Sequence, residues 1–216
     1  MKKIVLIGAS GFVGSAILNE ALNRGIKVTA VVRNPEKIKI SNPNLTIVKA
    51  DVSDADKVAE IAKGSDAVIS ADNPGWKNPN IYEDTLKTYP AILKGTKKAG
   101  VERLLIVGGA GTLFVAAGVR VIDSGAIPAE IMGGVKSLGE FYLNTLMNEK
   151  EIDWVFFSPA GRIEPGERTG LYRLGKDDLI MNEKGESKIS VQDYAKAMID
   201  ELETPAHHWE RFTIGY

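Results

Sequence analysis

The sequence lacks cysteine altogether and contains only two histidines, the adjacent pair His207 and His208. Without cysteine the chain cannot form disulfides, use a thiolate as a nucleophile or bind a metal through sulfur. The two histidines point in different directions because they are neighbours, and the sequence near them supplies no ligand cluster. We therefore expect no metal site and no thiol chemistry.

The chain also lacks a charge excess and a long apolar run. It carries 27 Lys and Arg against 28 Asp and Glu, so its formal net charge is −1. This balance gives no reason to expect a nucleic-acid or membrane partner. The first apolar run is too short and too broken by glycine for a signal peptide or a membrane span. We expect a cytoplasmic protein, a monomer or homodimer, that acts on a small molecule.

The first fourteen residues carry the clearest motif. The run Ile4–Ile7 leads directly into a G-x-x-G-x-x-G pattern. An apolar run without alternation is typical of a strand that is covered on both faces, as in a parallel sheet. In a dinucleotide site the first glycine allows a tight turn, the second lets the pyrophosphate approach, and the third lets the helix pack on the strand. The pattern predicts cofactor contacts from this turn by Gly8, Ser10, Gly11, Phe12 and Val13.

Strand and helix patterns then alternate along the chain. Further strands are predicted at 27–32, 45–49, 66–70, 103–107, 153–157 and 211–214, and helices at 11–24, 55–63, 82–99, 129–150 and 192–202. This order predicts an α/β fold, a Rossmann doubly wound parallel sheet with helices on both faces, formed by one domain over residues 1–216. A small C-terminal substrate lobe is expected at about 160–190, with strand-like pieces at 169–174 and 179–181. Residues 113–127 show no clear pattern.

The residue after the second strand predicts the type of cofactor. An acidic residue there would bind the 2′-hydroxyl of the adenosine ribose, whereas an arginine can hold a 2′-phosphate with two hydrogen bonds. The residue is Arg33, and Lys37 lies close by. The sequence therefore favours NADP(H) over NAD(H). An ordinary solvated arginine that opens a turn is the alternative interpretation.

The ends of other strands supply further candidate cofactor contacts, because parallel strands bind ligands at their carboxyl edge. Asp51 and Val52 follow the third strand, where a carboxylate or a backbone N–H can meet the adenine edge. Ala71 and Asp72 follow the fourth strand, where small residues would let a ribose lie against the backbone. Pro159 follows the sixth strand at the same edge.

Candidate residues for the chemistry lie on the other loops of this edge. Thr112 is the first hydroxyl after the glycine-rich end of the fifth strand. Trp76 lies in a turn-rich loop that we interpret as a mobile flap, with a surface loop that binds nothing as the alternative. Arg162 and Tyr172 belong to the expected lobe. We assign Trp76, Arg162 and Tyr172 to the substrate.

The chain resembles the extended and atypical short-chain dehydrogenase/reductases. Within them it is most similar to NAD(P)-binding NmrA-like proteins and NADH-flavin reductases, a subgroup that includes biliverdin-IX-beta/flavin reductase-like enzymes. The segments that carry the resemblance are Gly8–Gly14, Val32–Pro35, Ala50–Val52, Gly108–Gly111, Phe157–Ala160, Pro165–Gly170 and Ile189–Ala195.

The resemblance implies a role for Lys136 and also a departure from the family pattern. Many of these enzymes use a Tyr-x-x-x-Lys pair, in which the ammonium lowers the pKa of a proton-donating phenol. Lys136 matches the lysine, but the tyrosine position is Met132, and Tyr142 lies six residues beyond the lysine, on a different face of the helix. A thioether cannot pass the proton. Lys136 would then hold the nicotinamide ribose, and a surface lysine is the alternative.

These observations lead to one main hypothesis and two others. The main one is an NADPH-dependent reductase of a flavin or similar flat acceptor, because solvent can supply the proton for flavin reduction. Its catalytic residues would be Lys136 and Thr112. The alternatives are a non-catalytic NAD(P) redox sensor and an NAD-dependent epimerase or dehydratase, the last suggested only by likeness of fold.

Overall fold

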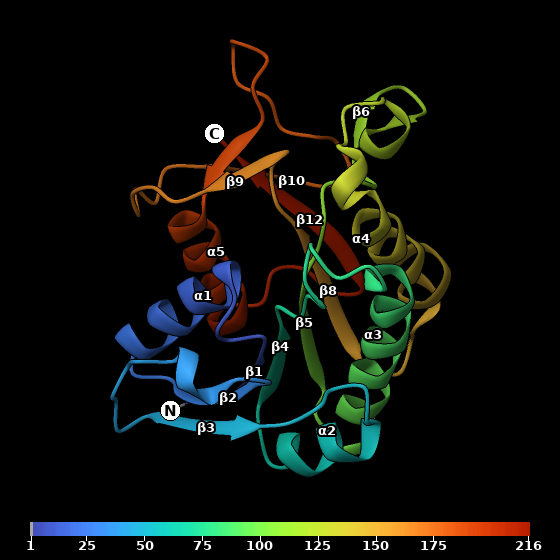
Figure 1. The fold of residues 1–216 in the computed structure, drawn as a ribbon. Helices are drawn as coiled ribbons and strands as arrows, with labels where there is room; N and C mark the ends of the chain where they lie inside the picture. Colours follow the sequence, from blue (N-terminus) through green and yellow to red (C-terminus); the bar gives the residue numbers. More distant parts are fainter. Residues whose placement is uncertain (1) are drawn as a thin grey trace.

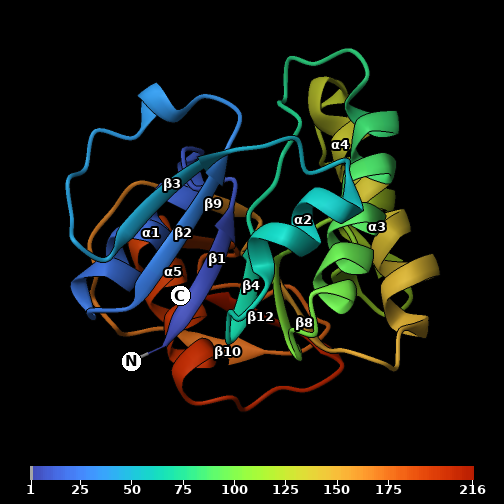
Figure 2. The same ribbon diagram turned by 90° about the horizontal axis from the view of Figure 1, so that it is seen from below.

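A computed structural model describes residues 2–216 and contains a central sheet of eight strands in the order β10-β12-β8-β5-β4-β1-β2-β3 (Figure 1). All neighbouring strands are parallel except β10 and β12. Figure 2 shows β3, β2 and β1 side by side. The strands are β1 Lys3–Ile7, β2 Lys27–Val32, β3 Leu45–Lys49, β4 Ala67–Ser70, β5 Arg103–Val107, β8 Asp153–Ser158, β10 Arg173–Gly175 and β12 Glu210–Gly215. The predicted Rossmann doubly wound fold is confirmed.

Helices cover both faces of this sheet, which explains why its strands are apolar without alternation. One face is covered by α1 (Phe12–Asn23) and α5 (Val191–Glu203), and the other by α2 (Ala55–Ala62), α3 (Ile81–Lys98) and α4 (Ala129–Glu140) (Figure 1). Ile4 and Leu6 of β1 belong to the first of the two resulting cores, and Val5 and Ile7 to the second. Successive side chains of a strand point to opposite faces, so both sets are buried.

The other short strands form two separate two-stranded sheets. Strand β9 (Arg162–Glu164) pairs in parallel with β11 (Lys188–Ser190), and β6 (Phe114–Ala116) forms a hairpin with β7 (Val119–Arg120). The 3₁₀ turns η1 (Pro35–Lys37) and η2 (Val121–Asp123) lie in loops. Among residues 2–216, no helix combines the length and apolar character needed to cross a bilayer.

Three predicted elements differ from the structure. Residues 179–181 form no strand. The chain meets Phe114 only at the preceding residue, Asp178, in an isolated bridge made by the bonds from Phe114 N to Asp177 O and from Leu179 N to Phe114 O. The strand predicted at 169–174 is β10, which begins only at residue 173. The helix predicted at 129–150 is α-helical only to Glu140.

A π-helical turn, η3 (Phe141–Thr145), and a 3₁₀ turn, η4 (Leu146–Asn148), follow α4. The helix widens where two adjacent aromatic residues both enter the core: Phe141 packs on Tyr89, and Tyr142 stacks on Phe156 with ring centroids 4.5 Å apart. Because packing decides this change, the sequence pattern did not reveal it.

The contact between α2 and α3 depends on Gly95, and this gives a stability prediction. A Cβ atom at Gly95 would lie 2.6 Å from Ala55 O and 2.6 Å from Val58 Cβ. On an exposed helix surface Gly→Ala stabilises by up to about 1 kcal/mol. Here we expect Gly95→Ala to lower the free energy of unfolding by roughly 1–3 kcal/mol, because the core is already filled. Urea denaturation measures this, with exposed Lys94→Ala as the control; an unchanged or higher stability of Gly95→Ala would contradict the prediction.

Candidate functional site

The glycine turn after β1 has three glycines with separate roles. Gly8 adopts φ +77°, and a Cβ there would lie 2.3 Å from Ala71 O. A Cβ at Gly14 would lie 2.1 Å from Gly8 O, so this glycine lets α1 pack on the turn. At Gly11 a Cβ would meet only Gly8 O, at 3.3 Å. Gly11 therefore leaves its outer side open to a ligand.

Helix α1 begins directly after this turn, next to the outer side of Gly11. Gly11 is its N-cap and provides no side-chain cap for the first N–H groups of the helix. Such groups, together with the positive end of the helix dipole, bind phosphates. Phe12 is half-exposed at the helix start, whereas Val13 packs against the core.

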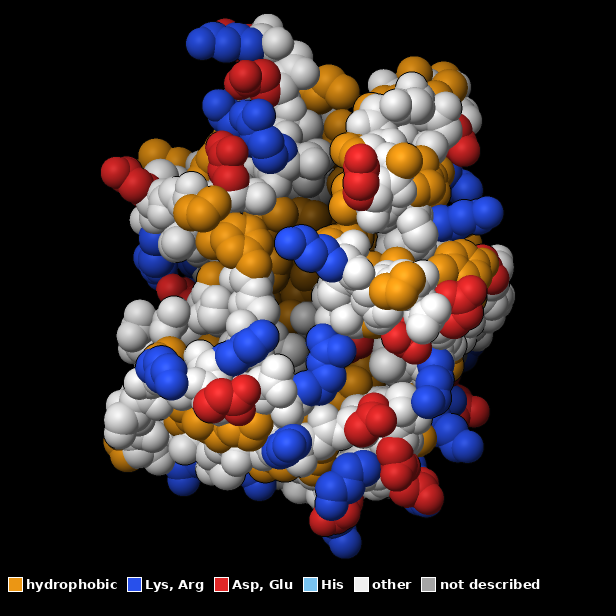
Figure 3. All heavy atoms as spheres, in the orientation of Figure 1, with side chains coloured by type: hydrophobic (Ala, Val, Ile, Leu, Met, Phe, Trp, Pro, Cys, Tyr) orange, Lys and Arg blue, Asp and Glu red, His pale blue; other side chains and the backbone are white. Residues whose placement is uncertain are grey.

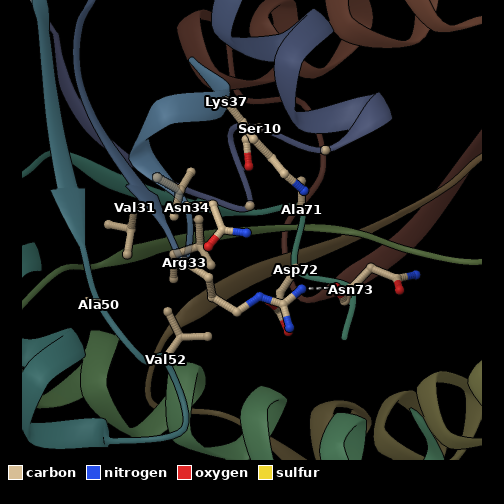
Figure 4. Close-up of a pocket in the computed structure, with 14 residues that line it drawn as sticks. Ser10, Val31, Arg33, Asn34, Lys37, Ala50, Val52, Ala71, Asp72 and Asn73 are labelled. Atoms are coloured by element: carbon tan, nitrogen blue, oxygen red, sulfur yellow. Dashed lines mark hydrogen bonds between the residues drawn. The ribbon is translucent and has the colours of Figure 1, made fainter. Parts of the chain in front are cut away.

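A pocket of about 160 Å³ opens at the carboxyl ends of β1, β2 and β4 (Figure 4). A second pocket of about 620 Å³ adjoins it and includes Asp51 and Lys87. The first pocket brings together seven of the predicted cofactor residues: Gly8, Ser10, Gly11, Arg33, Val52, Ala71 and Asp72. The ends of three neighbouring strands meet here because the sheet is parallel.

Arg33 stretches across the boundary between the two pockets. Its Nη2 donates to Asn73 O at 3.2 Å (Figure 4). Its Nη1 donates to Pro74 O at 3.3 Å. Lys37 reaches into the first pocket toward Ser10 and Ala71 (Figure 4). A guanidinium and an ammonium thus flank one cavity at the end of β2, an arrangement suited to a phosphate group.

The half-buried Asp72 lies next to this arginine. Its Oδ2 accepts a hydrogen bond from Thr88 Oγ1 at 3.0 Å, and its backbone oxygen accepts one from the Tyr89 hydroxyl at 2.7 Å. Burial raises the pKa of the Asp72 carboxyl, and the hydrogen bond from Thr88 and the charge of Arg33 oppose this rise. By contrast, the pKa of the exposed Asp51 carboxyl is lowered by its bonds to Ser53.

Helix α4 brings Lys136 close to the glycine-rich end of β5. A Cβ at Gly111 would lie 2.3 Å from Val135 Cγ1, and one at Gly139 would lie 2.9 Å from Thr112 Cγ2. Helix and loop are therefore in contact on both sides of Lys136, which is itself exposed. Trp76 packs on the same helix, since a Cβ at Gly134 would lie 2.8 Å from its Cζ3.

Thr112 is held inside the protein. It is 4% exposed, and its Oγ1 accepts a hydrogen bond from Arg211 Nη1 at 2.7 Å. Arg211 also donates from Nε to Asp177 at 2.9 Å, and its guanidinium lies 5.0 Å from the ring centroid of Tyr142. The threonine thus connects the β5 loop to β12. Its assignment as a catalytic residue stays a prediction.

The other residues assigned to substrate or cofactor lie apart. Arg162 is exposed and pairs with Glu164 at 3.2 Å. The Tyr172 hydroxyl donates to Asp200 of α5 at 3.0 Å, in a separate pocket of about 260 Å³. The structure therefore does not bring Tyr172 together with Trp76. Pro159 follows β8, where Ser158 Oγ donates to Gly109 O at 2.9 Å and ties the ends of β8 and β5 together.

Several pocket residues were not predicted from the sequence. Asn34 and Asn73 adjoin predicted positions and extend the first pocket. Lys87 and Thr88 line the second pocket from the middle of α3. Adjacency to a strand end could have indicated the asparagines, but no sequence signal reveals which turn of α3 faces the end of β3.

The space-filling view shows how the site continues beyond these pockets. Between α1, α5 and β9 on one side and α3 and α4 on the other, the face is hollowed along its middle (Figure 3). Hydrophobic side chains line the hollow, and Lys and Arg side chains surround it (Figure 3). An apolar lining with a charged rim is common in sites that bind small organic molecules.

A model of an NAD(P)H-binding family matches residues 8–205. The chain belongs to this NAD(P)H-binding family. The uncharacterized protein YwnB of Bacillus subtilis (strain 168) is 42% identical over 215 residues, which cover 98% of this chain and 97% of YwnB. The predicted resemblance to NAD(P)-binding short-chain dehydrogenase/reductases is confirmed, and the chain is an NAD(P)-binding protein of oxidoreductase type.

Two solved structures are similar over the whole chain. A protein of Bacteroides thetaiotaomicron, provisionally named an epimerase, is 68% identical with a TM-score of 0.95, over 100% of this chain and 97% of the other. A protein of Streptococcus pneumoniae TIGR4, provisionally named an NADH-flavin reductase, is 33% identical with a TM-score of 0.81, over 100% and 99%. Their names indicate different reactions, so the reaction has to be argued from this chain's own site.

The different surroundings of Gly11 and Gly14 lead to a paired prediction. We expect Gly11→Ala to keep the stability of the protein within about 1 kcal/mol, because its Cβ meets a single atom, and to weaken NADPH binding at least about tenfold. Gly14→Ala should lower the stability by roughly 1–3 kcal/mol as well, since its Cβ overlaps the turn. Calorimetric titration with NADPH and urea denaturation measure the two effects. Equal losses of stability in both variants would contradict this division of roles.

Proposed function

We propose that the protein is an NADPH-dependent reductase that reduces a flavin or a similarly flat acceptor without a catalytic tyrosine. The observation that carries this proposal is that none of the six tyrosine hydroxyl groups is placed to donate a proton to a substrate. Five donate their hydroxyl hydrogen to a fixed partner, and the sixth, Tyr142, is buried beside Arg211. The five donors are Tyr82 to Glu140, Tyr89 to Asp72 O, Tyr172 to Asp200, Tyr194 to Phe157 O and Tyr216 to Asp193.

The surroundings of these phenols also work against proton transfer. Burial raises the pKa of Tyr89, Tyr142, Tyr172 and Tyr194, and the hydrogen bond to Glu140 raises that of Tyr82. A reductase in the family pattern needs a phenol whose pKa is lowered by a nearby ammonium. The pKa of each of these five phenols is raised and not lowered, and Met132 occupies the expected position. The reaction therefore has to be one that needs no protein acid.

Flavin reduction meets this requirement. When bound, NADPH supplies the hydride, and solvent supplies the proton that completes the reduced flavin. The residues of this chain would bind and orient the two partners: the glycine turn the pyrophosphate, Arg33 and Lys37 the 2′-phosphate, and Lys136 the nicotinamide ribose. Trp76 would offer an aromatic surface to the acceptor in the hollow.

The same phenol arrangement supports a second candidate, a redox sensor that binds NAD(P) without turnover. Such a sensor must bind the oxidised and reduced cofactors with different affinities. Equal dissociation constants for NADP⁺ and NADPH would exclude the redox-sensor function. An epimerase or dehydratase in the family pattern is the weaker candidate, because that chemistry also depends on the tyrosine.

Activity with purified protein tests the reductase. We expect steady NADPH oxidation on addition of FMN, riboflavin or a quinone, followed by the absorbance of NADPH. Lys136→Ala should lower kcat/KM for NADPH on the order of tenfold to a hundredfold, because one charged hydrogen bond contributes about 1.5–3 kcal/mol. Met132→Leu is the control and should leave turnover unchanged. Tight NADPH binding with no turnover on any acceptor would overturn the proposal.

Cofactor preference gives a separate prediction for Arg33. We expect Arg33→Asp to weaken NADPH binding on the order of tenfold to a hundredfold, because it removes a charge-assisted contact with the 2′-phosphate. NADH binding should be retained or strengthened, since a carboxylate can accept from the 2′-hydroxyl. The ratio of the two dissociation constants, measured by calorimetry, is the test; a ratio equal to that of the unmodified protein would show that Arg33 is a surface arginine.

A further inference from the structure

We propose that Arg33 is also a positioning residue for the segment Asn73–Trp76, here called the Trp76 segment. It would link recognition of the 2′-phosphate to the placement of Trp76 on the acceptor side. The link to catalysis rests on the proposed function, whereas the positioning itself does not.

The first part of the argument is the way Arg33 holds this segment. Its two Nη atoms donate to two consecutive carbonyl oxygens, those of Asn73 and Pro74. Asn73 in turn accepts a hydrogen bond from Gly75 N through its Oδ1 at 2.7 Å. Gly75 has φ +117°, a conformation that favours glycine. The loop after β4 therefore forms one defined turn, and Arg33 binds the carbonyl oxygens of Asn73 and Pro74 in it.

The second part is the other end of the segment. Trp76 is 51% exposed, but one edge of its indole ring contacts α4 where Gly134 leaves room. Ile81 at the start of α3 fills the rest of this gap, since a Cβ at Gly134 would lie 2.7 Å from its Cδ1. The segment therefore runs from the end of β2 to the helix that carries Met132 and Lys136.

The third part is the number of donors on a guanidinium. Arginine has five N–H groups in a planar fork, and the two carbonyls use only two of them. The others remain for a phosphate, so one side chain can bind both at once. A phosphate on Arg33 would fix the guanidinium and, through it, the two carbonyls.

The experiment observes Trp76 directly in the complete chain. The protein is labelled with 5-fluorotryptophan, and the ¹⁹F signal of Trp76 is assigned by its loss in Trp76→Phe. We compare Arg33→Gln, Arg33→Lys and Lys37→Gln. Lys37 lines the same pocket and serves as the matched control, because among residues 2–216 the two side-chain hydrogen bonds that reach Asn73 O and Pro74 O both come from Arg33. Arg33 is exposed, so its substitution should leave the urea midpoint of unfolding close to that of the unmodified protein.

The expected results differ between the variants. Arg33→Gln should shift or broaden the Trp76 signal of the ligand-free protein and leave the signals of Trp154 and Trp209 in place. Arg33→Lys should do the same, because an ammonium keeps the charge but lacks the fork that spans two carbonyls. Lys37→Gln should leave all three signals unchanged. Both Arg33→Gln and Lys37→Gln should weaken binding of 2′,5′-ADP at least tenfold.

Ligand titration supplies the second readout. Saturating 2′,5′-ADP should shift the Trp76 signal of the unmodified protein, and 5′-AMP, which lacks the 2′-phosphate, should not. An unchanged Trp76 signal in Arg33→Gln, or equal responses to the two nucleotides, would overturn the positioning role. Neither readout depends on turnover, so failure of the proposed reductase activity is distinguishable from failure of this proposal.

Discussion

The close approach of backbone segments at Gly8 is the constraint on which the rest of the structure depends. Gly8 N donates to Val31 O of β2 at 3.0 Å, and Ala71 N, just after β4, donates to Ile7 O at 2.9 Å. The turn is therefore bonded to both neighbouring strands while it starts α1. Because no Cβ fits at Gly8 or Gly14, any side chain there would separate the strand ends that form the pocket. The sheet, the start of α1 and the candidate cofactor pocket all depend on this one backbone arrangement.

Features that depend on local signals could be predicted from the sequence. The apolar run Ile4–Ile7 indicated a strand buried on both faces, and its side chains do divide between the two cores. The glycine spacing indicated the turn and the start of α1 for the same reason. The parallel pair β9–β11 was missed, because its two strands are short and 23 residues of intervening chain, from 165 to 187, carry no repeating pattern. The π-helical turn at Phe141 was missed because core packing alone decides it.

The candidate site also has some residues that local sequence patterns predict and others that depend on distant contacts. The cofactor residues lie at strand ends, and strand ends can be located from pattern, so Arg33 and Asp72 do line one pocket. The sequence predicts a catalytic role for Thr112 because it is the first hydroxyl after a glycine-rich strand end. Its partner Arg211 is 99 positions away in the sequence, and no local pattern shows that this guanidinium binds it. The hydrogen bond from Tyr172 to Asp200 was likewise not predictable, because Asp200 lies 28 positions away on α5.

The difference between backbone-built and side-chain-built parts of the site is consistent with the different reactions that the names of similar proteins indicate. The cofactor half of the site is built mostly from backbone: a glycine turn, a helix N-terminus and the ends of parallel strands. Backbone geometry survives sequence change, as the TM-score of 0.81 at 33% identity demonstrates. The residues proposed to face an acceptor lie on separate loops and on α4, where one substitution, such as a methionine in place of a phenol, changes which proton transfers are possible. Cofactor binding can therefore be shared by chains with the same backbone, whereas the proposed reaction depends on side chains such as Met132, Lys136 and Trp76.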